Sequence, residues 1–313
     1  MNTEERINSE EMYPESPENR TGYEINPGGL TGEKKRSRRK RVFIILTVLL
    51  LLTVGELIRS NNYIQAEEFT FFSNDLPKSF DGFRIVQVSD IHNRSIGGLV
   101  DKIRDQKPDI IVITGDVADA IRTDTDRADE LLIAVSEVAP CYLVWGNHDM
   151  DISGEERTKM RECCVRHGIR VLENSFVRLE KGGESILIAG TDSDPDSRKF
   201  TSMMESFPKG EEFVIWLHHY PEDFERIIES SESAGSRADL VFAGHAHGGL
   251  IRPPFIGGLY APGQGIFPKY TSGQYNEGES TMFVSRGVGN SGYTLRFLDT
   301  FHLVVCELKS GKM

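Results

Sequence analysis

The hydrophobic pattern of the chain opens with an uncharged, largely apolar run from Val42 to Gly55, which Leu57 and Ile58 extend beyond Glu56. A helix that spans a bilayer needs roughly 20 apolar residues, with a lower limit of about 17, so this run is short but sufficient. Residues 34–41 form a basic block directly before it. A basic flank and apolar residues all round the helix are typical of a membrane anchor rather than of a core helix. We therefore predict a transmembrane helix over 42–60 behind a basic juxtamembrane segment, 34–41.

The first 33 residues are polar and acidic, contain Pro and Gly, and show almost no apolar periodicity. Such a composition predicts a disordered tail, 1–33. Because basic residues stay on the cytoplasmic side of a membrane, the N-terminus is expected in the cytoplasm and the chain beyond about Asn61 outside it. This predicts a single-pass protein of the cell membrane. A cleaved signal peptide is the alternative, although no clear cleavage site of small residues follows the run.

Beyond the anchor, short β-branched runs alternate with helical patterns, and we predict one domain over 61–313. In the first half, strands are predicted at 83–88, 109–114 and 141–145, with helices at 97–105 and 127–138 between them. The order strand, helix, strand predicts a parallel sheet of the α/β class. The second half predicts short strands in 171–187, with a Gly-Gly turn at 182–183, and at 212–217, 239–243, 282–285 and 303–308.

Five polar motifs directly follow predicted strands. In chain order they are Asp90-Ile91-His92, Gly115-Asp116, Gly146-Asn147-His148-Asp149, His218-His219 and Gly244-His245-Ala246-His247. Open α/β sheets build ligand sites where their strands end. A single Asp or His at such a place is more often a turn or cap residue, but five motifs rich in Asp, His and Asn favour a shared site.

The residue types in these motifs predict metal binding. Two divalent ions about 3.5–4 Å apart can clamp the attacking and departing oxygens of a phosphoryl group. Imidazole and carboxylate ligands together suit Mn, Zn, Fe or Ni. Asp90 and His92 are two residues apart, so on a strand both would point to one face. Asp116, at the end of the neighbouring strand, could bridge two ions, and Asn147 offers an uncharged oxygen.

The order of the five motifs resembles the calcineurin-like metallophosphoesterase family over about Phe83 to Leu308. Residues 244–249 and Ser285-Arg286-Gly287 resemble its membrane-associated bacterial branch. The resemblance implies a four-layer α/β/β/α sandwich that holds two metal ions. By that resemblance Asp116 bridges the ions, and each ion has three further ligands: Asp90, His92 and His247 for one, and Asn147, His219 and His245 for the other.

The resemblance also assigns roles to residues that bind no metal. His219 is preferred over His218 as a ligand because it lies two residues before Pro221. His148 is expected at the substrate phosphate, where it protonates the leaving oxygen, and Asp149 is expected to orient it. Arg286 is a candidate for neutralising phosphate charge, with a structural ion pair as the equal alternative.

The implied activity is hydrolysis of phosphodiester or related phosphate ester bonds by a metal-bound hydroxide. The predicted anchor favours a lipid or cell-envelope substrate. A phosphomonoesterase or nucleotide hydrolase is the alternative within this class, and a non-catalytic interaction scaffold is the alternative outside it. A metallopeptidase is disfavoured because the sequence has no H-E-x-x-H motif. The formal net charge of −12 argues against general affinity for nucleic acid.

Overall fold

The computed structural model describes residues 29–95, 97–192, 198–210, 212–292 and 294–312. The chain divides into two units, Met1–Leu52 and Thr53–Met313. Helix α1 (Gly29–Ser60) contains the predicted anchor, and its part Lys35–Ser60 is long and apolar enough to cross a membrane. Of the predicted disordered tail, residues 1–28 lie outside the described part, whereas residues 29–33 are helical. The helix extends this far back because the basic block contains good helix formers and no proline.

Two six-stranded sheets form the core of the second unit. In order across the first sheet are β1 (Ile64–Ser73), β14 (Phe301–Ser310), β2 (Arg84–Val88), β3 (Ile110–Thr114), β4 (Cys141–Val144) and β5 (Arg170–Val171). In order across the second are β12 (Gly273–Glu277), β13 (Ser280–Val284), β9 (Leu240–Ala243), β8 (Val214–Leu217), β7 (Glu184–Gly190) and β6 (Ser175–Lys181). A small hairpin pairs β10 (Tyr260–Ala261) with β11 (Gly265–Ile266).

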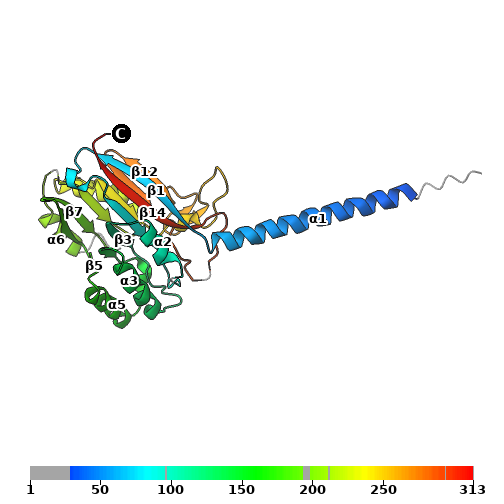
Figure 1. The fold of residues 1–313 in the computed structure, drawn as a ribbon, viewed down its shortest axis with the longest axis horizontal. Helices are drawn as coiled ribbons and strands as arrows, with labels where there is room; N and C mark the ends of the chain where they lie inside the picture. Colours follow the sequence, from blue (N-terminus) through cyan, green and yellow to red (C-terminus); the bar gives the residue numbers. More distant parts are fainter. Residues whose placement is uncertain (1–28, 96, 193–197, 211, 293, 313) are drawn as a thin grey trace, which may run out of the picture. The chain divides into compact units, whose positions relative to one another are not determined.

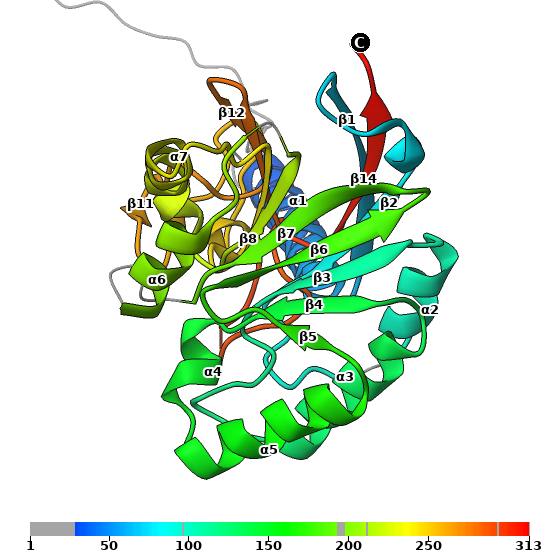
Figure 2. The ribbon, with the colours of Figure 1, turned by 90° about the vertical axis from the view of Figure 1, so that its left-hand side faces the viewer.

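Helices cover the outer face of each sheet (Figure 2). On the first sheet lie α2 (Leu99–Asp105), α3 (Thr125–Ser136) and α5 (Gly154–Arg166), and on the second lie α6 (Arg198–Ser206) and α7 (Phe224–Ser233). A third apolar cluster fills the space between the sheets, where Ile85 and Val112 of the first meet Ile188 of the second. The predicted α/β/β/α sandwich is therefore confirmed.

The strand pattern follows from burial on both faces. In β2, Ile85 belongs to the cluster between the sheets and Val86 to the cluster under the helices. Strands covered on both sides appear in a sequence as continuous β-branched runs, as β3 does. The register is parallel through β2, β3 and β4, as predicted, while β14 pairs antiparallel with β2 and parallel with β1, which lies beside it (Figure 1).

The ends of strands from both sheets meet at one edge. Gln87, near the end of β2, donates from Nε2 to the Ala243 carbonyl at the end of β9 over 2.8 Å. The same amide donates to Thr114 Oγ1 at the end of β3, also over 2.8 Å. This junction brings the loops that follow β2, β3, β4, β8 and β9 together, and all five predicted polar motifs lie in those loops or in the short helices α4 (Asn147–Asp151) and η3 (His247–Gly249).

Candidate metal centre

The first group of candidate ligands contains Asp90, His92, Asp116 and His247, whose ligand atoms all lie within 4.8 Å of one another. His92 Nε2 and His247 Nε2 are 3.2 Å apart. His247 Nε2 lies 3.7 Å from Asp90 Oδ1, and His92 Nε2 lies 3.6 Å from Asp116 Oδ2. All four residues are buried, so their polar atoms face one another rather than water.

The second group contains Asp116, His219 and His245. His219 Nε2 lies 3.3 Å from Asp116 Oδ2 and 3.2 Å from His245 Nδ1. Asn147 joins this group, because its Oδ1 lies 3.2 Å from the same His219 nitrogen. Asp116 therefore belongs to both groups, and the structure brings all seven predicted ligands to one place.

Most of these residues have a left-handed backbone. Positive φ angles occur at Asp90 (51°), His92 (47°), Asp116 (52°), His245 (62°) and His247 (46°). Non-glycine residues adopt such angles at an energetic cost, and they cluster at functional sites. β2 ends at Val88 and β9 at Ala243, so the idea that strand alternation aligns the pairs two residues apart is wrong. Left-handed turns after the strands align them instead.

Glycines allow backbone segments to approach one another closely at these turns. Gly115 and Gly146 come from the ends of neighbouring strands, and a Cβ added to either would lie 2.5 Å from the backbone of the facing loop. At Gly115 the φ of +90° also favours glycine. Glycines in the Gly-Asp and Gly-Asn-His-Asp motifs therefore allow the close packing that places Asp116 at the centre.

Burial keeps three of the histidines neutral. It lowers the pKa of His92 to about 4 and that of His245 to about 3, and it lowers the pKa of His247 well below its ordinary value. A neutral imidazole offers a lone pair, which is the form that binds a metal ion. Among the described residues, His92 Nδ1 is buried without a hydrogen-bond partner.

The carboxylates respond to burial and to their neighbours. Burial raises the pKa of Asp90 to about 6. Burial also acts to raise the pKa of Asp116, but His219 outweighs it and holds that pKa below its usual range. Conversely, burial acts to lower the pKa of His219, but Asp116 outweighs it and raises the value to about 10. Asp116 thus strongly favours a positive charge beside it, which a metal ion would supply.

The contact of His219 on its far side also fits a metal ligand. Its Nδ1 lies 2.7 Å from the Thr114 carbonyl oxygen, to which the N–H donates. A histidine that binds a metal through one nitrogen usually donates from the other to a carbonyl or carboxylate, which fixes its tautomer. The adjacent His218 differs, since it lies between Thr191 Oγ1 at 2.8 Å and Asp223 Oδ2 at 3.0 Å and belongs to neither ligand group.

His148 lies at the edge of the centre, with its side chain 15% exposed. Its ring meets the His92 ring edge to face, with 4.6 Å between centroids. The Nδ1 atom accepts a hydrogen bond from the Ala120 N–H at 3.0 Å, and Nε2 lies 3.2 Å from Ser291 Oγ. Asp119 is the carboxylate beside this ring, with Oδ1 3.6 Å from Nδ1.

The expectation that Asp149 orients His148 is wrong in this structure. Both oxygens of Asp149 accept backbone N–H groups instead, from Ala118 at 2.8 Å and Gly146 at 3.0 Å. Asp149 is fully buried and holds the loops in place, and burial raises its pKa to about 7. Asp119, which lies beside the His148 ring, also caps its own turn, because its Oδ1 accepts the N–H groups of Ile121 and Arg122. A feature of the sequence that could have marked Asp119 as a neighbour of the site is its position three residues after Asp116.

Arg286 does not reach the candidate ligands. It is 8% exposed, and its guanidinium donates to the Thr300 carbonyl and to Ser272 Oγ. It also lies 3.4 Å from Asp299 Oδ1 and 3.6 Å from Glu67 Oε2. Each guanidinium nitrogen of Arg286 is hydrogen-bonded within the domain. The structure therefore favours the alternative of a structural ion pair over a role in phosphate binding.

Another arginine, Arg296, contacts the centre. It is fully buried, and its Nη2 lies 3.1 Å from His247 Nδ1 and 2.8 Å from the Gly289 carbonyl oxygen. Its Nε donates to Asn290 Oδ1 over 3.0 Å. No local motif marks this residue, since 49 positions separate it from the histidine that it contacts.

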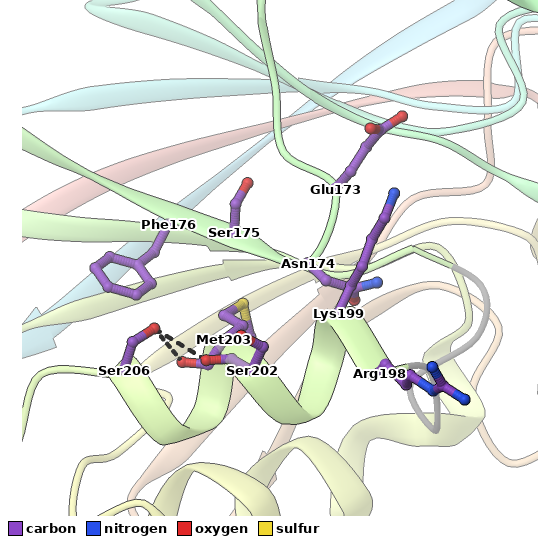
Figure 3. A pocket seen from close by; sticks show the side chains of 9 residues that line it. All are labelled: Glu173, Asn174, Ser175, Phe176, Arg198, Lys199, Ser202, Met203 and Ser206. Carbon is purple, nitrogen blue, oxygen red and sulfur yellow. Dashed lines mark hydrogen bonds between the residues drawn. The ribbon is translucent and has the colours of Figure 1, made fainter.

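A surface pocket of about 470 Å³ lies elsewhere, between β6 and α6 (Figure 3). Glu173, Arg198 and Lys199 are among its lining residues, and none of the predicted site residues lines it. Glu173 is already bound to Arg161 and to the Trp145 indole. This pocket is therefore separate from the candidate metal centre.

Comparison with known proteins identifies the class. A family model described as calcineurin-like phosphoesterase matches residues 83–249. The chain is 30% identical over 302 residues to the uncharacterized metallophosphoesterase YkuE of Bacillus subtilis, covering 88% of this chain and 99% of that protein. It is 28% identical over 195 residues to the phosphodiesterase YaeI of Escherichia coli, covering 61% and 67%. It is 25% identical over 293 residues to a transmembrane protein with a metallophosphoesterase domain of Danio rerio, covering 87% and 63%.

The fold and the site thus define a phosphoester hydrolase with a candidate metal centre. The chain belongs to the calcineurin-like phosphoesterase family, as its five motifs predicted.

Proposed function

We propose that the protein is a dinuclear metal-dependent phosphodiesterase anchored in the cell membrane. The observation that carries the dinuclear assignment is the position of Asp116 in both ligand groups. A carboxylate shared by two sets of imidazole and carboxylate donors is suited to bridging two ions. One ion would take Asp90, His92 and His247, and the other would take Asn147, His219 and His245.

Mn, Zn, Fe or Ni ions fit these donors. When bound, such ions lower the pKa of a water that attacks phosphorus and stabilise charge on the phosphoryl oxygens. Three of the four imidazole ligands are already neutral and the bridging carboxylate is ionised, whereas His219 holds a proton beside Asp116 that a bound ion would displace. The predicted ligands lie together and none is missing, which favours an enzyme over a non-catalytic scaffold.

His148 is suited to protonate the leaving oxygen. Because its Nδ1 accepts from the Ala120 N–H, the proton of the neutral ring lies on Nε2. That nitrogen faces Ser291 at the partly exposed edge of the centre, where a substrate oxygen could replace the hydroxyl. Proton transfer by a positioned histidine contributes typically about 10²–10⁴-fold to a rate.

The substrate class follows from the anchor and from one relative. The similar E. coli protein YaeI is a phosphodiesterase. In the present chain an apolar helix leads directly into the domain, and such an anchor would restrict the enzyme to substrates near a bilayer. We propose a phosphodiester of a lipid or of the cell envelope as the substrate. A phosphomonoesterase or nucleotide hydrolase is the alternative.

The activity can be tested with the purified full chain in detergent micelles. After chelation, Mn, Zn, Fe or Ni is added back singly, and a panel of phosphomonoesters and phosphodiesters is assayed. We expect activity only with metal, and faster turnover of diesters. Hydrolysis of monoesters alone would select the alternative enzyme, and no hydrolysis with any metal would favour the scaffold.

The topology can be tested by cysteine labelling of intact cells. All four native cysteines are buried, so an exposed Gln274→Cys in β12 gives a selective site. We expect a membrane-impermeant maleimide to label it in intact cells, because the basic block holds the N-terminus in the cytoplasm. Protection of this cysteine until the cells are lysed would reverse the topology.

A further inference from the structure

We propose that two loops beside the metal centre form an apolar rim that inserts into the membrane interface, so that the site takes the phosphoester of a lipid headgroup at the bilayer surface. The apolar rim is defined as residues 250–267 and 294–298. This inference rests on the proposed anchor and on the proposed phosphoesterase activity.

The rim exposes large apolar side chains close together. The exposed fractions are 108% for Phe255, 75% for Ile266, 70% for Phe267, 66% for Leu295 and 60% for Ile256. Backbone bonds join the two loops, since Phe297 donates to Leu250 over 3.0 Å and accepts from Arg252 over 3.1 Å. Large exposed apolar side chains on adjoining loops mark a candidate interaction site.

The rim offers no free charge to such a partner. Residues 250–267 contain one charged side chain, Arg252, and its Nη1 donates to Gly248 and Thr271 of the fold. In residues 294–298 the one charged side chain is Arg296, which is fully buried. A partner that binds here is therefore recognised through apolar contact, as the acyl boundary of a bilayer would be.

The backbone of the rim is strained at apolar residues. Leu250, Phe255, Phe267 and Leu298 have φ angles of 59°, 69°, 54° and 58°. Every apolar residue with a positive φ in the described part of the chain lies in the rim. A bulky residue adopts this conformation at an energetic cost. Packing offsets little of that cost at Phe255 and Phe267, because both rings are exposed. Strain of this kind points to a function for the exposed rings.

The rim borders the metal centre directly. A Cβ added to Gly263 would lie 3.6 Å from His245 Nε2, and Arg296 contacts the His247 ring. Ser291, just before the second loop, contacts His148. A surface that docks on the rim would therefore present its phosphate groups beside the candidate ligands.

The end of α1 is bonded to the same rim, and this identifies the occupant as a lipid surface. Asn61 follows α1 directly, and its Oδ1 accepts from the Arg296 N–H over 3.0 Å while its Nδ2 donates to the Arg296 carbonyl over 2.9 Å. The last apolar residue of the anchor, Ile58, lies three positions earlier, or about 5 Å along a helix at 1.5 Å per residue. Leu57 and Ile58 belong to the same unit as the rim, so a bilayer that reaches this apolar end of α1 would also lie beside the rim.

Insertion can be measured by fluorescence quenching in the full chain reconstituted into phosphatidylcholine vesicles. Phe255→Cys and Ile266→Cys would each carry an environment-sensitive fluorophore, and the native cysteines, all buried, leave the label selective. Val165→Cys on α5 is the control, because Val165 is also apolar and 72% exposed. We expect lipids with a doxyl group near the headgroup to quench the two rim labels at least about threefold more than the control. Equal, weak quenching at all three sites would overturn the inference, as would burial of the rim labels against a second copy of the chain.

A second measurement separates this inference from the proposed function. Wild type, a Phe255→Ser/Phe267→Ser variant and a Val165→Ser control are assayed on a phosphodiester embedded in vesicles and on a water-soluble nitrophenyl diester. Each large apolar side chain contributes enough burial free energy for a change of about tenfold or more. We expect the rim variant to lower the ratio of vesicle to soluble rate at least about tenfold, and the control to keep it. An unchanged ratio overturns the inference, whereas a wild type inactive on both substrates overturns the proposed function and leaves the quenching result to decide insertion.

Discussion

Two largely buried polar clusters in this domain use similar residue types and differ in how their charges are arranged. The metal centre gathers carboxylates and imidazoles around Asp116. The second, which we call the charge-paired cluster, consists of Glu67, Arg286, Arg296, Asp299 and His302. Arg296 belongs to the second cluster and contacts the first through His247.

The charge-paired cluster is largely balanced. Asp299 lies 3.4 Å from Arg286 and 3.5 Å from Arg296, and His302 Nε2 lies 3.2 Å from Glu67 Oε2. In the metal centre, by contrast, two histidine nitrogens approach each other within 3.2 Å and burial keeps them neutral. Buried charges that find opposite partners stabilise a fold, whereas several imidazole and carboxylate groups that converge on one point suit a cation. Arrangement, rather than composition, therefore separates a ligand site from a structural cluster.

The sharpest test compares the two adjacent histidines after β8. His219→Ala removes a candidate ligand, and loss of several kcal/mol of charge stabilisation corresponds to a rate loss of at least about 10³-fold. His218→Ala removes a side chain that is hydrogen-bonded to Thr191 and Asp223 and belongs to neither ligand group, so we expect less than about a tenfold loss. Turnover of a phosphodiester and metal content would be measured on both. Equal losses of turnover and metal would contradict the assignment of His219, rather than His218, as the metal ligand.

His148→Ala separates metal binding from proton transfer. We expect the variant to keep its metal and to lose about 10²–10⁴-fold in turnover of substrates with poor leaving groups. Nitrophenolate needs little protonation, so the loss should be smaller with a nitrophenyl ester. An equal loss on both substrates would mean that His148 positions the phosphate, and no loss on either would remove it from the active site.

Arg286→Met tests the assignment of Arg286 to the charge-paired cluster. Removing one member of a buried pair costs about 3–5 kcal/mol, so we expect a thermal midpoint about 10 °C lower for a domain of this size. The KM for a phosphodiester should change less than about twofold, because no donor of Arg286 faces the candidate ligands. The control Arg178→Met removes an exposed ion pair with Glu212 and should cost at most about 1 kcal/mol. A large rise in KM at unchanged stability would return Arg286 to phosphate binding.

The charge-paired cluster also predicts a pH dependence. Burial lowers the pKa of His302 from 6.5 to about 4. The unfolded chain therefore takes up a proton as the pH falls below 6.5, and the folded chain resists it. The stabilisation is complete above pH 6.5 and is lost progressively as the pH falls to about 4, for a total of about 3 kcal/mol. The free energy of unfolding of wild type should decline more steeply over this range than that of His302→Gln, and parallel slopes would contradict the shift.

Much of the fold could be predicted because the buried strands are continuous β-branched runs. The predicted strands at 109–114 and 239–243 differ from β3 and β9 only by one residue at the start. The strand β1 was missed, since Glu67 and Glu68 interrupt its apolar pattern. Those charges are tolerated because β1 is an edge strand, and Glu67 faces Arg286 and His302.

The candidate site was predicted as a set of residues but not as a geometry. The motifs mark Asp90 and His92, yet their left-handed backbone depends on loops that pack across two sheets. Asp149 was predicted to orient His148, but Asp119 is the carboxylate beside that ring, because spacing along the chain does not reveal which carboxylate faces His148. The contact between Arg296 and His247 joins distant segments, and no local pattern predicts it.

The most direct test of the shared carboxylate is the metal content of three purified full-length proteins, measured by elemental analysis. Wild type should hold two ions per chain. His247→Ala removes a ligand of one ion and should retain more metal than Asp116→Ala, which removes the bridge between both. Two ions per chain in Asp116→Ala, equal to wild type, would contradict the assignment of Asp116 as the bridging ligand and with it the dinuclear centre proposed for this protein.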